Sequence, residues 1–265
     1  MQPSFTLHRG TAPLLVSMPH TGTELPESVI GTMTDVALQV DDTDWHIERL
    51  YEFAQRLGAS ILQPRYSRYL VDLNRPPDNT SLYPGQNTTG LCPDTTFDGV
   101  PLYREGLHPD AAEVARRLEL YWRPYHAALQ EELARLQQAH DIVRLWDAHS
   151  IRSHVPRLFD GELPVFNFGT ASGAACDSAI AEALLAQVGR LAPEQPAVLN
   201  GRFKGGYITR AYGAPQRGVH AIQLELAQRS YMMETAPYTY DEQLAGPLQA
   251  TLENLLAQFI AWQPQ

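Results

Sequence analysis

Short apolar runs recur along the chain and predict buried strands. Each is too short for a typical helix, and several end at a proline, a glycine or a polar residue. The predicted strands cover residues 14–18, 59–63, 69–73, 142–147, 163–168 and 219–224.

Between these runs, apolar residues recur at spacings of three and four, which predicts helices over 46–57, 109–140, 174–191 and 241–262. Gly58 is well placed to end the first helix. Pro124 has no amide hydrogen, so we expect a kink or a split into two helices near Arg123. Strands that alternate with helices predict an α/β fold, a three-layer sandwich with a mostly parallel or mixed sheet and helices on both faces.

Residues 77–108 show no clear periodicity and are rich in proline, glycine, asparagine and threonine. A stretch of about 30 residues is longer than connecting loops usually are. The segment is therefore either a functional loop or lid over a site, or a mobile surface excursion, and the sequence leaves both open.

The composition is that of an ordinary soluble globular protein, with 44% hydrophobic and 19% charged residues. No apolar run approaches the roughly 18 residues that a membrane span needs. Residues 1–5 lack the basic and apolar layout of a signal peptide, so we expect a cytoplasmic protein. No repeat or shift in composition divides the chain, and we expect one domain over 1–265.

The formal net charge of −10 argues against a nucleic-acid partner, because phosphate binding needs a basic surface. An anionic small molecule would instead need a local cluster of arginine and lysine. Cys92 and Cys176 are far apart in the sequence and outside any Cys-x-x-Cys motif, so we expect both to be reduced thiols.

Polar residues that can bind a metal or a substrate, or transfer a proton, lie at or just past the ends of predicted strands. They are His20, Asn74, Arg75, His149 and Glu225. We expect the strand over 142–147 to end at Asp147 and to leave His149 on the following loop. If the strands are parallel, all these side chains rise from one edge of the sheet. A single histidine there is more often a hydrogen-bonded structural residue, but two strand-terminal imidazoles suggest a metal.

A catalytic zinc site commonly has two histidines, one carboxylate and a fourth position left open for water. His20 and His149 supply the imidazoles. The run over 41–44 contains three aspartates, more than the capping of the following helix requires. Asp44 is the first choice for the carboxylate ligand, and the alternatives are Asp41, Asp42 and Glu24.

Glu225 is the candidate general base, because a carboxylate at a strand end is rigid enough to take a proton from an attacking water. The alternative is a buried acid paired with an arginine. Arg75 can hold a substrate carboxylate through two parallel hydrogen bonds or polarise the carbonyl under attack.

The segment 200–210 carries three cations among glycines in an otherwise acidic chain. Such a segment is either a loop that closes on an anion or a solvated β-hairpin with ordinary surface charge. Beside a candidate metal site, anion binding is the better interpretation. The substrate-binding candidates are then Asn74, Arg75, Arg202, Lys204, Tyr207 and Arg210.

Several motifs together resemble the N-formylglutamate amidohydrolases, also called N-formylglutamate deformylases. They include Ser-Met-Pro-His-Thr-Gly at 17–22, Val-Asp-Leu-Asn-Arg-Pro at 71–76 and Asp-Ala-His-Ser at 147–150. Further matching segments are 42–46, 102–106, 121–126, 200–210 and 223–226, so that the resemblance covers nearly the whole chain in order. It implies a zinc-dependent or other divalent-metal-dependent amidohydrolase that releases formate and glutamate, a step of histidine degradation.

This family is similar to the zinc carboxypeptidases and aspartoacylases, which implies a carboxypeptidase-like, phosphorylase/hydrolase-like fold. Those relatives have a first ligand motif, then Asn-Arg, a second histidine and a catalytic glutamate, an order kept here. The first motif departs from theirs, because they use His-x-x-Glu and the third residue after His20 is Thr23. This departure is a reason to prefer Asp44 over Glu24 as the acidic ligand.

The resemblance leaves three alternatives to N-formyl-L-glutamate hydrolysis. The enzyme could act on another N-acyl acidic amino acid or resemble a carboxypeptidase in activity, or the chain could bind a dicarboxylate without catalysis around a structural metal. A structural zinc is usually closed by four ligands, often cysteines, and neither cysteine lies in a ligand-like segment. We expect one divalent ion, zinc first, although cobalt, nickel and iron suit the same ligands. The expected partner is a small N-acyl amino acid, and the expected state is a monomer or small homo-oligomer.

Overall fold

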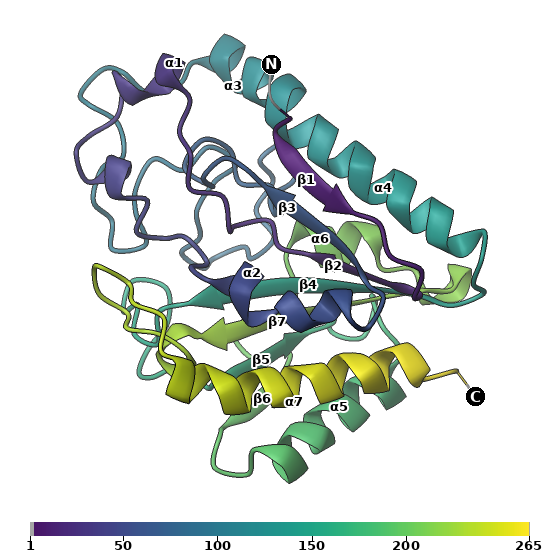
Figure 1. Cartoon of the computed structure of the whole chain (residues 1–265). Coiled ribbons are helices and arrows are strands. Elements are labelled where there is room, and N and C mark those ends of the chain that lie inside the picture. Colours follow the sequence, from purple (N-terminus) through teal and green to yellow (C-terminus); the bar gives the residue numbers. More distant parts are fainter. Residues whose placement is uncertain (1–2, 265) are drawn as a thin grey trace.

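A seven-stranded sheet forms the centre of the computed structural model, which describes residues 3–264 (Figure 1). Met1, Gln2 and Gln265 lie outside the described residues, and with them part of the N-terminal stretch 1–5, where the sequence predicts no signal peptide. The strands are β1 (Phe5–His8), β2 (Leu14–Ser17), β3 (Ser60–Pro64), β4 (Val143–Ile151), β5 (Phe166–Gly169), β6 (Ala197–Leu199) and β7 (Val219–Ala227).

The strand order in the sheet is β1-β3-β2-β4-β7-β5-β6. The four strands β3, β2, β4 and β7 are parallel to one another. Strand β1 is antiparallel to β3, and β5 is antiparallel to β7 but parallel to β6. The prediction of a largely parallel or mixed sheet is confirmed.

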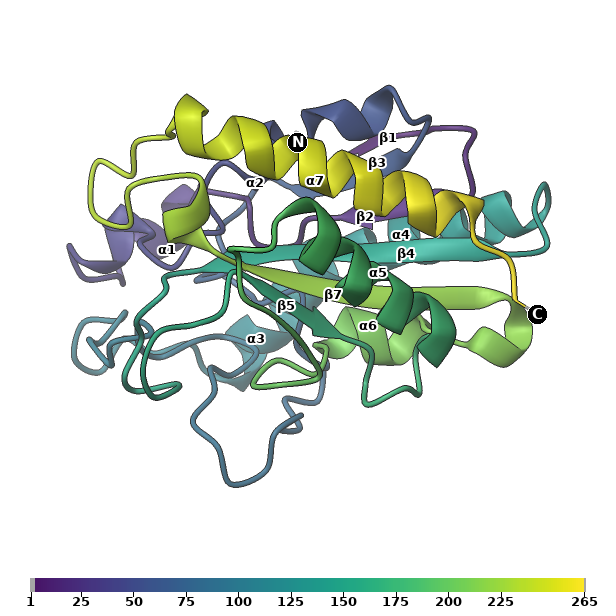
Figure 2. The same cartoon turned by 90° about the horizontal axis from the view of Figure 1, so that it is seen from below.

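Helices cover both faces of this sheet (Figures 1 and 2). On one face, α5 (Ser178–Leu191) and α7 (Glu242–Ala261) lie side by side with α2 (Ile47–Leu50), over apolar residues such as Trp146. On the other face, α4 (Arg123–Gln137) and α6 (Tyr207–Tyr212) pack on residues such as Leu145. Trp146 and Leu145 are neighbours in β4, and successive side chains of a strand point to opposite faces. The predicted three-layer arrangement is confirmed.

The remaining helical segments are short. They are α1 (Glu27–Ile30), α3 (Ala111–Arg117), the 3₁₀ turns Ala37–Gln39, Glu52–Gln55, Pro215–Arg217 and Gln228–Ser230, and a π-helical segment over Leu118–Trp122. None of the helices in residues 3–264 combines the length and the apolar character needed to cross a bilayer.

The predicted helix over 109–140 divides close to the expected position. α3 continues into the π-helical segment 118–122, and α4 begins at Arg123 with Pro124 in its first turn. The amide of Arg123 donates to Leu118 O five residues earlier, so a π-helical turn lies directly before Pro124 and marks the position where the regular α-helical bonding changes. The predicted helix over 46–57 is likewise α2 followed by a 3₁₀ turn, and Gly58 follows it with a positive φ of 74°.

Two predictions about strands are wrong. Residues 69–73 form no strand: the amide of Leu70 donates to Ser67 O and that of Asp72 to Leu91 O, so that local and loop contacts replace a ladder. An apolar run shows that a segment is buried but does not show what its backbone amides bond to. β4 also continues past Asp147 and places His149 inside the strand, because it pairs with β7 along nine residues on each strand.

This longer pairing places four polar side chains on one face of the sheet. His149 and Glu225 are directly paired in register on β4 and β7, and so are Asp147 and Gln223 two residues earlier. Because side chains alternate along a strand, all four point to the face covered by α4 and α6, near the carboxyl ends of the parallel strands.

Candidate metal centre and substrate pocket

Three side chains from distant segments meet at the carboxyl end of the sheet. His20 lies in the turn after β2, Asp44 precedes α2, and His149 is in β4. One ligand atom from each lies within 4.8 Å of the others, and all three side chains are buried. Nδ1 of His149 is 3.0 Å and Nδ1 of His20 is 3.7 Å from Asp44 Oδ2. The backbone amide of Asp44 also donates to His20 O at 3.1 Å, which holds these two segments together.

Each imidazole is oriented by a second buried carboxylate. Asp72 Oδ1 is 2.7 Å from His20 Nε2, and Asp147 Oδ1 is 3.1 Å from His149 Nε2. In both histidines Nδ1 therefore faces Asp44. His20 resembles metal ligands whose second ring nitrogen donates to a carboxylate. His149 Nε2 also lies 2.8 Å from Nδ2 of Asn74, which is a donor because Asn74 Oδ1 accepts from the amide of Ile208. We did not single out Asp72 or Asp147 from the sequence. The sequence nevertheless contains a feature that could have identified them as buried site residues, because each is a lone acid within an apolar run.

The electrostatics of this cluster favour a bound cation. Burial alone would raise the pKa of Asp44 and Asp72, but His20 and the other nearby positive groups lower both. Burial would lower the pKa of His149, and the charges of Asp147 and Asp44 instead hold it well above its usual value. Asp44 and Asp72 are therefore ionised near neutral pH. Two imidazole nitrogens and one carboxylate oxygen are the donor set of many catalytic zinc sites, so the residues fit a divalent ion.

The alternative carboxylates lie outside this cluster. Asp41 accepts from the Tyr238 hydroxyl at 2.6 Å, and Asp42 accepts from the amide of Phe97 at 2.7 Å. Glu24 is half exposed and pairs with Arg65 at 2.7 Å. None of the three caps α2, whose N-cap residue is His46 and forms no side-chain capping bond. The structure thus brings Asp44 alone of the four candidates to the two histidines.

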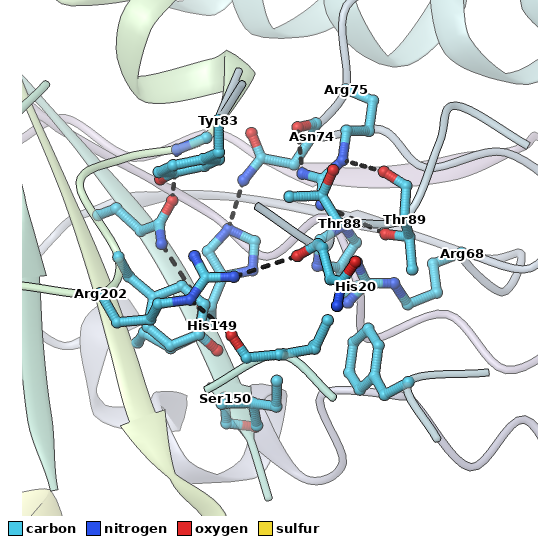
Figure 3. Close-up of a pocket in the computed structure, with 18 residues that line it drawn as sticks. His20, Arg68, Asn74, Arg75, Tyr83, Thr88, Thr89, His149, Ser150 and Arg202 are labelled. Atoms are coloured by element: carbon cyan, nitrogen blue, oxygen red, sulfur yellow. Dashed lines mark hydrogen bonds between the residues drawn. The ribbon is translucent and has the colours of Figure 1, made fainter. Parts of the chain in front are cut away.

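A pocket opens beside the two histidines (Figure 3). Glu225 faces it from β7 and is 8% exposed, and its carboxylate accepts a long hydrogen bond from Gln223 Nε2 at 3.5 Å. Burial raises the pKa of Glu225 to about 8, with Asp44 adding to the rise and His149 opposing it. A cation held by the histidines would act in the same direction as His149 and favour the ionised carboxylate.

Two guanidinium groups enter the pocket from different sides (Figure 3). Arg75 donates to Thr89 O at 2.8 Å, and Arg202 donates to Leu158 O at 2.9 Å and to Asn87 O at 3.2 Å. These acceptors are uncharged, and both side chains are only partly exposed. Burial, together with repulsion from Arg75, lowers the pKa of Arg202. The pair therefore offers positive charge to a ligand.

A third arginine, which sequence reasoning missed, also lines the pocket. Arg68 is 7% exposed and donates to Asp72 Oδ2 at 2.7 Å, while its NH1 lies 3.8 Å from Asp44 Oδ1. Unlike Arg75 and Arg202, Arg68 is already paired with two buried carboxylates, those of Asp72 and Asp44.

The other predicted substrate-binding residues fall in two groups. Asn74 lines the pocket and donates to Asp147 Oδ2 at 3.1 Å. Lys204 is exposed, Tyr207 stands in α6 near Trp122, and Arg210 donates to Gly205 O, so that these three lie outside the pocket lining. The segment 200–210 is a loop leading into α6, not a β-hairpin.

The irregular segment 77–108 supplies much of the pocket wall, through Tyr83, Asn87, Thr88, Thr89 and Phe97. Tyr83 also donates to Gly205 O at 3.0 Å and accepts from the amide of Lys204. This wall agrees with the interpretation of a functional loop.

Comparison with known proteins agrees with this geometry. Residues 12–232 match the N-formylglutamate amidohydrolase family. The chain is 52% identical to an N-formylglutamate deformylase of Pseudomonas putida (99% of this chain, 97% of the relative) and 55% identical to one of Pseudomonas aeruginosa (99% and 98%). It is also similar to the crystal structure of an N-formylglutamate amidohydrolase from Ralstonia eutropha, with a TM-score of 0.81 and 26% identity over 98% of this chain and 97% of that chain. The chain therefore belongs to the N-formylglutamate amidohydrolase family.

Proposed function

We propose that this protein hydrolyses N-formyl-L-glutamate to formate and L-glutamate with the help of one bound divalent metal ion. The observation that carries this proposal is the buried cluster of His20, Asp44 and His149, which shares a pocket with the carboxylate of Glu225 and two arginines. The full-length identity to deformylases supports the same substrate.

His20 and His149 would bind the ion through Nδ1, and Asp44 through a carboxylate oxygen. Asp72 contacts Nε2 of His20, and Asp147 and Asn74 contact Nε2 of His149, so that Nδ1 of each ring faces Asp44. Zinc is our first choice for the ion, and when bound it would supply a Lewis acid that polarises the formyl carbonyl and makes water easier to deprotonate.

Glu225 is the proposed general base. Its carboxylate accepts a proton from the water that attacks the formyl carbon, and it then delivers this proton to the amide nitrogen as the carbon–nitrogen bond breaks. Cleavage gives formic acid and the free amine of glutamate, and the acid proton then passes to the amine, so that formate and the ammonium form of glutamate leave and atoms and charge balance. Glu225 is only 8% exposed, which limits the exchange of this proton with bulk water.

Arg75 and Arg202 are the proposed partners of the two substrate carboxylates. A guanidinium binds a carboxylate through two parallel hydrogen bonds, and both side chains have uncharged acceptors here. Arg75 stands next to Asn74 and could also polarise the carbonyl. Two unneutralised cations in one pocket favour a dicarboxylate over a monocarboxylate.

The experiment is a formate-release assay on purified protein before and after removal of metal with a chelator. We expect release from N-formylglutamate, loss with the chelator and recovery on adding zinc. N-formylglutamine has the same shape but lacks the side-chain carboxylate, and we expect it to turn over much more slowly. Tight binding of the substrate with no formate from the metal-loaded protein would instead support a non-catalytic dicarboxylate-binding domain.

A further inference from the structure

Gln223 occupies a position in β7 that the mechanism above does not use. It precedes Glu225 by two residues, so both side chains point to the same face of the sheet. Its side chain is 4% exposed and lines the pocket. A buried amide at this position must have partners for both ends, because an unpaired buried polar group is costly.

The orientation of this amide is fixed by its partners. Oε1 of Gln223 accepts from the backbone amide of Gly206 at 2.6 Å. A backbone N–H can only donate, which assigns the oxygen to that side and turns Nε2 towards Glu225 Oε2, at 3.5 Å. The bond is long, but it is the one recorded hydrogen bond to the Glu225 carboxylate among residues 3–264.

Gly206 is itself a rigid anchor for this amide. A Cβ at Gly206 would lie only 2.4 Å from Asn74 Nδ2, so the backbone packs directly against that side chain. The two amides that follow Gly206 donate to Asn74, from Tyr207 to its backbone oxygen at 3.2 Å and from Ile208 to Oδ1 at 2.8 Å. The acceptor side of Gln223 is therefore held to an element that has little freedom to move.

The backbone of Glu225 is held from the opposite side. Asn167 pairs with Glu225 across β5 and β7, and its Nδ2 donates to Glu225 O at 3.1 Å. The main chain is thus fixed, and the remaining freedom of Glu225 is rotation of its side chain. A donor beside one carboxylate oxygen restricts that rotation.

We propose that Gln223 is a positioning residue that orients the Glu225 carboxylate for proton transfer. The amide links the Gly206 anchor to Oε2 of Glu225 and leaves the other oxygen free to face the water and the leaving nitrogen. The proposal rests on the proposed role of Glu225 as the general base. Gln223 acts through Glu225 and does not itself exchange a proton.

The test is a double-mutant cycle in the metal-loaded enzyme. Gln223→Met removes both amide contacts at similar size, and Gln223→Glu keeps an acceptor for Gly206 but replaces the donor with a like charge. Each is made in the parent and in a Glu225→Gln background. Gln249→Met is the matched control, because Gln249 is a partly buried glutamine that donates to Arg49 O and Leu50 O away from the pocket.

In the parent background we expect either Gln223 variant to lower kcat roughly 10- to 100-fold, the order of one charge-assisted hydrogen bond, with KM and metal content little changed. In the Glu225→Gln background the same change should lower the residual kcat by less than about twofold, because a residue that acts through Glu225 has nothing left to orient. The control should match the parent in both kcat and KM.

Three results would overturn the proposal. One is a kcat within about twofold of the parent for both Gln223 variants. Another is an equal loss in both backgrounds, which indicates a general structural role. The third is a rise in KM with kcat unchanged, which indicates direct contact with substrate. Should Gln223→Met fail to fold, Gln223→Glu decides by the same criteria. Failure of the proposed function is visible separately, as absence of formate release by the parent or parent-like turnover by Glu225→Gln alone.

Discussion

His149 Nδ1 lies 3.0 Å from Asp44 Oδ2, although 105 residues separate the two in the chain. The same carboxylate oxygen accepts from the amide of Ser150 at 3.2 Å and lies 3.7 Å from His20 Nδ1. Asp44 is thus the carboxylate on which both imidazoles converge, and the proposed metal site depends on it.

Replacing Asp44 should abolish metal binding, whereas replacing Glu24 should not. Asp44→Asn keeps the size of the side chain but removes the charge between the two histidines. Glu24 is half exposed and paired with Arg65, so Glu24→Gln is the matched control. Elemental analysis of the purified variants measures the metal. Full occupancy in Asp44→Asn, or its loss in Glu24→Gln, would show that the ligand was assigned wrongly.

The orienting carboxylates should tune metal affinity without being ligands. Asp72→Asn and Asp147→Asn leave His20, Asp44 and His149 in place but weaken the hold on each ring, and such changes typically cost about 10- to 100-fold in metal affinity. Competition with a chelator measures the dissociation constant. Asp110→Asn, which retains a capping side chain at the start of α3, should behave as the parent does. Unchanged affinity in both site variants would assign Asp72 and Asp147 no part in the metal site.

Arg202 and Arg210 should differ, although both come from the same cationic segment. Arg202 lines the pocket, whereas Arg210 lies outside its lining and donates to Gly205 O. Arg202→Met should raise KM for N-formylglutamate roughly 10- to 150-fold, the effect of losing one charge-assisted hydrogen bond. Arg210→Met should change KM much less. Steady-state kinetics decide, and equal effects at the two positions would argue against a direct contact between Arg202 and the substrate.

Glu225→Gln should leave binding intact and remove turnover. Glutamine retains shape and hydrogen bonding but cannot accept the proton, and loss of a positioned base typically costs about 10²- to 10⁴-fold in rate. Metal content and the affinity for substrate, measured by calorimetry, should be close to those of the parent. A variant that turns over within about threefold of the parent, far short of that loss, would exclude Glu225 as the base.

His126 should make the protein less stable as the pH falls from about 6.5 to 4. Burial lowers the pKa of His126 to about 4, with its bond to Leu73 O opposing the shift. The unfolded chain, with an ordinary histidine pKa near 6.5, then binds more protons than the folded chain between these values. The free energy of unfolding should drop by up to about 3 kcal/mol across this window.

Urea unfolding of the parent and of His126→Gln between pH 4.5 and 8 measures this contribution. The variant should lose the part of the pH dependence that His126 contributes. His140→Gln, at a partly exposed histidine just after α4, should keep it. Identical pH profiles for the parent and His126→Gln would contradict the assignment.

The local pattern of apolar and polar residues along the sequence was enough to predict much of this fold. The buried strands that carry Trp146 and Leu224, the long amphipathic helices and the break near Pro124 all follow from side-chain periodicity and from the missing amide of proline. The positions of His20, His149 and Glu225 near strand ends also predicted the location of the candidate site, because parallel strands bring their carboxyl ends to one edge of the sheet.

Contacts between distant segments decided the rest. The sequence contained four candidate acids for the third metal position, and only folding brought Asp44, not Glu24, between the histidines. Asp72 stands in an apolar run that resembles a strand, and its role beside His20 follows from an irregular backbone that no periodicity encodes. Arg202 and Arg210 look alike in sequence, but the start of α6 between them leaves one facing the pocket and the other outside its lining. Periodicity reports burial and local backbone structure, whereas a site is set by which buried polar groups find each other across the fold.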